Sequence, residues 1–297
     1  MDLALELLLP AVAGSCAVVF THPAELAKTR LQLDRELASF GAPRQYKGWL
    51  DCVGKTYAQD GLPGLQRGLA LGVTREFFFN ATRIGLSGPM VAAIAASEAP
   101  TRTDRLAAGL ACGALGGCVV NPLEVLKIRA QSSGGRTGFQ HDRRAVGVFA
   151  QLLALARTEG ARGLCKGIGT SIFRGMVGPG SQLVAYNELK TAAVARGRDG
   201  AAVSTHVACS LMSAAVSIVL VNPPDVVRTR LYNQPVDSLG RGLHYNNGLH
   251  ALSRIVSAEG PAALYKGALT HYLRLGPHMV LVFGFLEQFK LLAKAAR

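Results

Sequence analysis

The sequence is poor in charged and aromatic residues and lacks the usual signatures of an enzyme. Of its 297 residues, 17% are charged and 6% are aromatic, whereas an average soluble domain is about 25% charged. The six cysteines form no CxxC pair, which disfavours a zinc site or a disulfide framework and favours scattered, reduced thiols. No nucleophile elbow, P-loop, metal cluster or paired-carboxylate site is present, so catalysis is disfavoured. An Arg/Ser-rich presequence is also missing, and we expect the apolar run from Leu3 to remain in the mature protein.

The net charge is strongly positive, at +13. This charge is compatible with a nucleic-acid-binding protein or with a membrane protein that has basic loops. Two long runs, residues 106–123 and 200–224, contain no charged residue at all. Such runs favour the membrane protein and argue against a soluble nucleic-acid binder, so we expect no nucleic-acid partner.

One motif occurs three times, and it organises the whole chain. Each copy starts with proline and has an acid two residues later, a base five later and a second base seven later. The copies occupy residues 23–30, 122–129 and 223–230. A second phrase, acid-Gly followed by base-Gly, keeps the same period at residues 60–68, 159–167 and 259–267. We therefore predict three repeats as domains, with the boundaries 1–98, 99–198 and 199–297.

Each repeat contains two apolar segments with a polar loop and a short amphipathic segment between them. We predict an all-α membrane protein with six transmembrane helices, in three pseudo-threefold repeats of two helices plus a short surface helix. The expected spans are residues 5–33, 69–96, 106–123, 168–194, 200–224 and 268–290. Within the third span, Gly109, Gly113 and Gly117 form a smooth strip for close helix packing. The loops hold 20 of the 32 Lys and Arg residues, so we expect them to face the positive-inside compartment.

The acid and the first base of each motif lie on one helix face, because they are three residues apart. Three such faces around a threefold axis predict a ring of ion pairs. The predicted pairs are Glu25 with Lys127, Glu124 with Arg228, and Asp225 with Lys28. Because charges in a membrane are costly unless they are paired, a ring that forms and breaks suits a gate. We expect Gln32 and Gln131 to brace it, with Tyr232 at that position in repeat 3. Static anchoring near lipid headgroups is the alternative.

Three arginines occupy equivalent positions on the second helix of each repeat. Counting seven residues from Gly68, Gly167 and Gly267 reaches Arg75, Arg174 and Arg274. Guanidinium groups match carboxylate or sulfate oxygens bidentately, so these residues predict a site for a small anion. Arg83, eight residues beyond Arg75, is expected to add a fourth positive charge. Glu76 beside Arg75 is an exception that either neutralises part of this charge or points to a neighbouring helix.

The three-repeat pattern resembles the mitochondrial carrier family (solute carrier family 25) over the whole chain. The resemblance implies a multi-pass six-helix barrel in the mitochondrial inner membrane that works as a monomer by alternating access. It implies that Arg75, Arg174 and Arg274 contact the substrate and that the predicted ring is the matrix gate. It implies no cofactor, but cardiolipin as a bound lipid at helix N-termini, where backbone N–H groups receive phosphate.

The family usually carries a second set of ion pairs on the even-numbered spans, as a cytoplasmic gate. Here the matching positions are Asn187 and Lys190 on span 4, and Glu287 and Lys290 on span 6. Span 2 offers only Gly88 and Val91, so no complete pair remains. We therefore expect a degenerate gate and a carrier that rests open to that side.

Three short runs sharpen the resemblance. Residues 229–237, 274–278 and 181–183 resemble the oxaloacetate/sulfate carrier branch, including members 34 and 35. This implies exchange of oxaloacetate, malate- or malonate-type dicarboxylates, or sulfate. One alternative is an uncoupler-like proton/anion carrier, which is suggested by His22, His271 and His278. The other alternative is another dicarboxylate or oxoglutarate carrier.

Overall fold

The structure is a computed structural model that describes residues 3–34, 36, 45–95, 100–132, 147–199, 202–237 and 241–295. In these ranges the chain is helical apart from short connections and one isolated β-bridge between Val236 and Gly242, which confirms the all-α prediction. The helices that pack side by side, called the long helices below, are α1 (Leu3–Leu33), α3 (Leu69–Gly85), α5 (Arg102–Ser132), α7 (Ile168–Ala195), α8 (Val203–Asn233) and α10 (Ala268–Ala295). The eight-residue helix α4 (Ser87–Ile94) follows directly after α3. The short ones are α2 (Trp49–Leu65), α6 (Val148–Leu164), α9 (Gly248–Glu259) and the 3₁₀ helix η1 (Pro261–Tyr265). All six cysteines are free.

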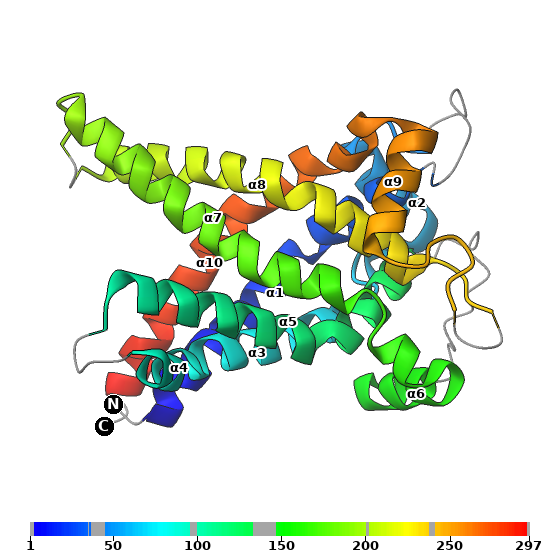
Figure 1. Ribbon diagram of the computed structural model, residues 1–297, viewed down its shortest axis with the longest axis horizontal. Coiled ribbons are helices and arrows are strands. Elements are labelled where there is room, and N and C mark those ends of the chain that lie inside the picture. The colour runs from blue at the N-terminus through cyan, green and yellow to red at the C-terminus, as the bar shows by residue number, and fades with distance from the viewer. Residues whose placement is uncertain are drawn as a thin grey trace.

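The long helices form a ring in which each contacts the next. Helix α1 packs on α3, α3 on α5, α5 on α7, α7 on α8, and α10 closes the ring by packing on both α1 and α8. The short helices α2, α6 and α9 all lie at one end, which we call the loop end (Figure 1). The start of α1 and the end of α10 lie at the opposite end, which we call the mouth end (Figure 1).

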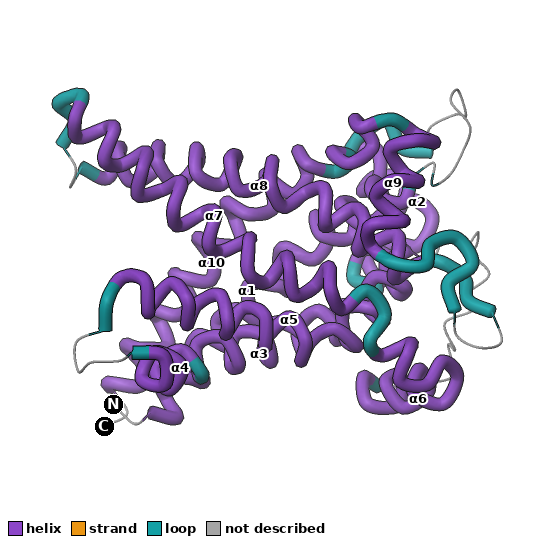
Figure 2. The backbone as a smooth tube through the Cα atoms, viewed as in Figure 1, coloured by secondary structure: helices purple, strands orange, loops and turns teal. Residues whose placement is uncertain are grey.

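The hydrophobic core is concentrated at the loop end. Its buried residues come from the second half of α5 (Leu126 and Ile128), from α8 (Leu231), from α9 (Ile255) and from η1 (Leu264). At the mouth end, by contrast, α5 and α7 diverge (Figure 2). The molecule is therefore closed and packed at one end and splayed at the other.

Close packing of α5 on α7 depends on glycines, as the sequence predicts, but on two of the three. A Cβ added to Gly117 would lie 2.8 Å from the carbonyl oxygen of Ser171, and one on Gly113 would collide with the backbone of Gly175. Gly109 has nothing within 4 Å of such a Cβ. The prediction is wrong for Gly109, because α5 has already separated from α7 at that height.

The second expected span is not one continuous helix. Helix α3 ends at Gly85, and α4 begins at Ser87 after a break at Leu86. Pro89 explains the break, because its ring would collide with the carbonyl of Gly85 and it offers no N–H to that carbonyl. The end of the expected span, at residue 96, lies outside the described residues.

By length and composition, two of the described helices qualify as candidate membrane spans. They are α5 and residues 204–233 of α8, with mean hydropathies of 1.6 and 1.8 over their best windows. Six spans and the exact repeat boundaries therefore stay predictions.

Candidate functional site

The three predicted ion pairs are present near the loop end, where α1, α5 and α8 converge. Lys127 Nζ lies 2.7 Å from Glu25 Oε1, and Lys28 Nζ lies 2.6 Å from Asp225 Oδ2. The third pair is looser, with 3.6 Å between Arg228 Nη2 and Glu124 Oε2. The six side chains are buried or nearly so. We call this set the gate ring, and its role as a gate stays a prediction.

The local fold explains why the second long helix of each repeat (α3, α7 and α10) starts at the right height to reach this ring. Gly68, Gly167 and Gly267 precede α3, α7 and α10 with φ of 81°, 62° and 74°, a backbone region that favours glycine. A Cβ on Gly167 would also lie 2.6 Å from the Tyr232 ring. Each of these helices therefore begins directly against the first long helix of a neighbouring repeat, which is α5, α8 or α1.

The residue before each motif proline ties down the loop in front of that start. His22 Nε2 lies 2.9 Å from the Arg67 carbonyl oxygen. Asn121 Nδ2 donates to the Leu164 carbonyl and Asn222 Nδ2 to the Leu264 carbonyl, both at 2.7 Å. These contacts repeat with the threefold pattern, so the arginines two turns further along reach equal depth.

The three arginines, which we call the arginine layer, contact the acids of the gate ring. Arg75 Nε lies 2.6 Å from Glu124 Oε1, and Arg174 Nε lies 2.5 Å from Asp225 Oδ1. Arg274 is more distant, with its Nη1 4.0 Å from Glu25 Oε1. Each acid is thus shared between a base of the ring and an arginine of the layer. Sequence reasoning missed this link, although both sets follow the same threefold spacing on helices that pack together.

The ring is not equally strong around its circumference. Asp225 is contacted by Lys28 and Arg174, and it also lies 3.4 Å from Arg228 Nη2 and 3.7 Å from His271 Nδ1. The contact between Glu25 and Arg274 is the longest of the series. Of the three arginines of the layer, Arg274 is therefore held most loosely by a ring acid.

The two glutamines expected to brace the ring bind elsewhere. Gln131 Oε1 accepts a 2.8 Å hydrogen bond from Thr29 Oγ1, and Gln32 Oε1 accepts one of the same length from Thr229 Oγ1. Among the described contacts, neither glutamine side chain bonds to a gate-ring ion. One helical turn beyond the bases, the glutamines bond to threonines of the neighbouring helix that also carries the ring, and their role as braces of the ring stays a prediction.

Tyr232, which replaces a glutamine in repeat 3, supports the ring differently. Its hydroxyl donates to Asn121 Oδ1 at 2.6 Å. Its ring centroid lies 5.9 Å from Arg228 Cζ, within cation–π range. Tyr232 therefore holds Arg228 in repeat 3 while the glutamines link helices in the other two interfaces.

The second base of each motif explains the acid-Gly phrase. Arg129 contacts both carboxylate oxygens of Glu159 at 2.5 and 3.0 Å, and Arg230 does the same with Glu259 at 2.5 and 2.9 Å. In repeat 1, Arg30 instead donates to Thr56 Oγ1 at 2.8 Å. These contacts fasten the surface helices to α1, α5 and α8, the first long helix of each repeat.

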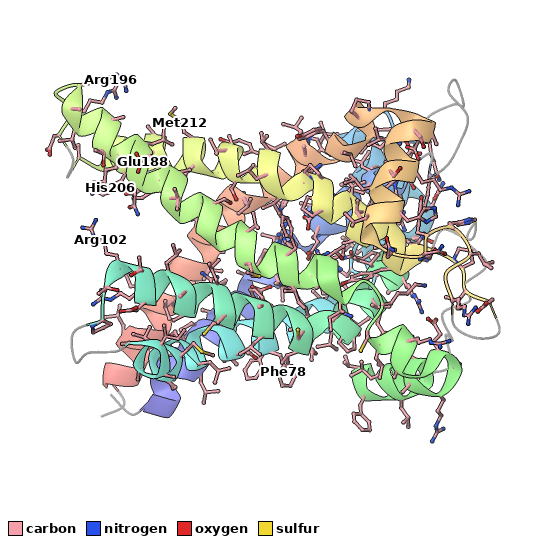
Figure 3. The ribbon with its side chains drawn as sticks, viewed as in Figure 1. Phe78, Arg102, Glu188, Arg196, His206 and Met212 are labelled. Carbon is pink, nitrogen blue, oxygen red and sulfur yellow. The ribbon has the colours of Figure 1, made fainter. Side chains whose placement is uncertain are left out.

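Arg83 lies away from the arginine layer, toward the mouth end. It lines a cavity of about 960 Å³ between the diverging parts of α5 and α7, together with Arg102, Arg105, Asn187 and Lys190. Arg102 and Glu188 lie on opposite sides of this opening (Figure 3). Arg83 is thus set apart from the other three arginines, in the lining of this cavity.

The expected second gate is open in the described residues. Asn187 and Glu287 are exposed, and within the described part of the chain no ion pair involves Asn187, Lys190 or Glu287. The side chain of Lys290 lies outside the described residues. The geometry agrees with a protein that is closed at the loop end and open at the mouth end.

A second cavity, of about 1210 Å³, lies where the starts of α7 and α9 meet. Its lining includes Lys166 and Gly167 before α7, Gly248 and Leu249 at the start of α9, and the apolar Phe173. Helix starts present free N–H groups that attract phosphate. Burial lowers the pKa of Lys166 to about 8. This donor set and the apolar wall fit an anionic phospholipid.

Comparison with known proteins identifies relatives over nearly the whole chain. The sequence profile of the family described as "Mitochondrial carrier protein" matches residues 2–90, 99–196 and 200–296. The chain is 33% identical over 279 residues to the mitochondrial 2-oxoglutarate/malate carrier protein of Mus musculus, covering 93% of this chain and 87% of the relative. It is 31% identical over 298 residues to solute carrier family 25 member 35 of Mus musculus, covering 96% and 97%.

A third relative is the mitochondrial oxaloacetate transport protein of Saccharomyces cerevisiae. It is 31% identical over 287 residues, which cover 93% of this chain and 86% of the relative. These matches confirm the family resemblance seen in the motifs.

Proposed function

Because this chain belongs to the mitochondrial carrier family, we propose that it exchanges small divalent anions across the mitochondrial inner membrane as a six-span monomer. The candidate substrates are oxaloacetate, malate- or malonate-type dicarboxylates, and sulfate. Relatives named as 2-oxoglutarate/malate and oxaloacetate carriers support this class. Their being carriers also supports transport rather than catalysis.

The charge of the central cluster is the observation that carries the proposal. Six cations and four carboxylates lie in contact there, so two positive charges are in excess when the histidines are neutral. The cations are Lys28, Lys127, Arg228, Arg75, Arg174 and Arg274, and the carboxylates are Glu25, Glu124, Asp225 and Glu76. Uncompensated buried charge is unfavourable. A dianion supplies the missing two charges.

The shared acids couple anion binding to the gate ring. A substrate carboxylate bound by Arg174 replaces Asp225 as the partner of that guanidinium, and the same exchange applies to Arg274 and Glu25. The substrate thereby loosens contacts that hold the ring acids in place. A ligand drives a conformational change only by binding one state better than the other, and this exchange of partners supplies the difference.

The cavity at the mouth end suits the entry of anions. Four of its lining residues are basic (Arg83, Arg102, Arg105 and Lys190), and Glu188 is the one acid among the lining residues. Clefts lined by one sign of charge concentrate ligands of the opposite sign. We assign Arg83 to this entry region, from which an anion moves to the arginine layer.

For the bound lipid, we propose cardiolipin in the cavity at the starts of α7 and α9. The N–H groups at the two helix starts receive its phosphates, and Arg162, Lys166 and Arg241 in the lining supply positive charge. The apolar residues Phe173 and Leu220 accommodate acyl chains. The lipid then fastens the surface helix of repeat 3 to repeat 2.

The uncoupler-like alternative depends on histidines near the cluster. His22 is already engaged with the Arg67 carbonyl and serves the loop in front of α3. His271 lies near Asp225, and His278 Nδ1 lies 3.3 Å from Thr21 Oγ1. Only the latter two remain candidates for proton transfer, and a dependence of uptake on the pH gradient would favour them.

The test is transport by the reconstituted protein. Proteoliposomes loaded with malate or sulfate should take up labelled oxaloacetate, and Arg174→Ala should abolish uptake because an arginine that contacts both substrate and Asp225 is lost. Arg254→Ala on the exposed face of α9 is the matched control and should transport normally. Unchanged uptake in the Arg174 variant would refute the assigned site.

A further inference from the structure

One acid breaks the threefold symmetry of the arginine layer. Glu76 follows Arg75, at the eighth residue after Gly68. The equivalent positions in the other repeats are Gly175 and Leu275, which cannot ionise. The asymmetry is therefore confined to repeat 1 and lies directly beside one of the three arginines.

The geometry shows that Arg75 is held between two carboxylates. Its Nη1 lies 2.5 Å from Glu76 Oε2, and its Nε lies 2.6 Å from Glu124 Oε1. Arg174 and Arg274 each contact one acid of the ring among the described residues, and for Arg274 the distance is 4.0 Å. The positive charge of Arg75 is thus compensated within the protein, whereas the other two arginines retain capacity for a ligand.

Glu76 is held in this position by its surroundings. Asn80 Nδ2 donates to Glu76 Oε1 at 3.1 Å. On the facing helix α1, a Cβ at Gly14 would lie 3.4 Å from Glu76 Cγ and 2.6 Å from Asn80 Nδ2. From α10, Arg274 and His278 act on Glu76 electrostatically. The glycine makes room for the pair, and each oxygen of the carboxylate has its own partner.

We propose that Glu76 is a specificity-determining residue that sets the charge of the transported anion at two. It neutralises Arg75 from within repeat 1, so that Arg174 and Arg274 take the two anionic groups of the substrate. Without Glu76 the cluster would carry three excess positive charges and would suit a trianion such as a tricarboxylate. This inference rests on the proposed function and names the substrate charge that the same site selects.

The test is the selectivity of Glu76→Gln, which keeps the shape and an oxygen for Asn80 but removes the charge. In proteoliposomes loaded with malate, uptake of labelled malate is measured against competing malate, sulfate and citrate. We expect the ratio of citrate to malate affinity to rise at least roughly tenfold in this variant. Glu76→Asp should keep the wild-type ratio, and so should the matched control Asp51→Asn, which removes an acid of α2 that pairs with Lys55 outside the proposed site.

A converse variant keeps the proposal falsifiable if Glu76→Gln does not fold. Leu275→Glu places an acid beside Arg274 in repeat 3 and should shift competition toward monoanions. Malate-to-citrate selectivity that is unchanged in a folded Glu76→Gln protein would overturn the inference. The inference would also be overturned if Glu76→Gln lost only the uptake of aspartate while its selectivity between malate and citrate stayed the same. Glu76 would then recognise the ammonium group of an amino-acid substrate. If wild type carries no dianion, the proposed function itself fails.

Discussion

At the loop end, each acid of the gate ring contacts two or more cations, whereas at the mouth end Asn187, Lys190 and Glu287 form no ion pair in the described part of the chain. The two ends also differ in packing. The loop end contains the hydrophobic core, besides a cavity of about 1210 Å³ at the starts of α7 and α9, whereas at the other end a cavity of about 960 Å³ separates α5 from α7. The difference shows that closure is unequally distributed. The ion pairs of the gate ring hold the loop end together, whereas the described residues at the mouth end carry no equivalent set.

The energetic reason lies in how buried ion pairs respond to loss of a partner. Removing one member of a buried pair costs about 3–5 kcal/mol, because the other charge is left uncompensated. Under the proposed mechanism, the loop end opens at low cost when a substrate anion takes the place of the ring acids. No such barrier protects the mouth end, where exposed pairs contribute about 1 kcal/mol at most.

The largest difference in stability between the two ends is expected when Asp225 of the gate ring is removed. Asp225→Asn leaves Lys28 and Arg174 without their 2.6 and 2.5 Å partner, so we expect stability to fall by about 3–5 kcal/mol. Thermal unfolding in detergent measures the loss. Glu287→Gln at the mouth end is the control and should change stability by less than about 0.5 kcal/mol. Equal effects at both ends would contradict the asymmetry.

An intermediate effect is expected when the missing gate is built. The triple variant Gly88→Asp, Val91→Lys and Asn187→Asp completes three possible pairs with Lys190, Lys290 and Glu287. Space is available, because nothing lies within 4 Å of a Cβ at Gly88. Three partly exposed pairs should favour closure of the mouth end by roughly 1–3 kcal/mol. A cysteine placed in the cavity should then react more slowly with a water-soluble thiol reagent, while an unchanged rate would show that these positions do not meet.

The smallest effect concerns pH and should appear only at the loop end. Burial raises the pKa of Glu36, in the connection after α1, to about 7. The folded protein therefore binds this proton more tightly than the unfolded chain does, and its contribution to stability is lost as pH rises through 7. Between pH 6 and 8, Glu36 should lower the Tm of the wild-type protein by no more than about 2 °C. This part of the decrease should be absent in Glu36→Gln.

The measurement must compare the dependence of Tm on pH in the wild-type protein with that in Glu36→Gln. Lys166, whose pKa is lowered to about 8, acts in the opposite direction, because the unfolded chain binds that proton more tightly. The difference in Tm between wild type and Glu36→Gln isolates Glu36. A difference that is the same at both pH values would show that Glu36 does not titrate in this range.

Much of the site followed from spacing. Glu25, Lys127 and their equivalents recur with the motif, so the pairs of the gate ring could be predicted from three in-phase copies. The break at Leu86 could have been predicted from Pro89, since a proline disrupts the preceding helical turn. The contacts of Gln32 and Gln131 could not, because a one-turn offset along a helix does not tell which side chain of the neighbouring helix stands opposite.

The sequence by itself determined the three repeats, the helical architecture, the partners within the gate ring and the equal depth of Arg75, Arg174 and Arg274, because these depend on periodicity along the chain. Only the tertiary structure decided that the arginines contact the ring acids and that Glu76 holds Arg75. The physical reason is that these features depend on how separate helices are rotated and tilted against one another, and the spacing of residues within a helix does not specify that.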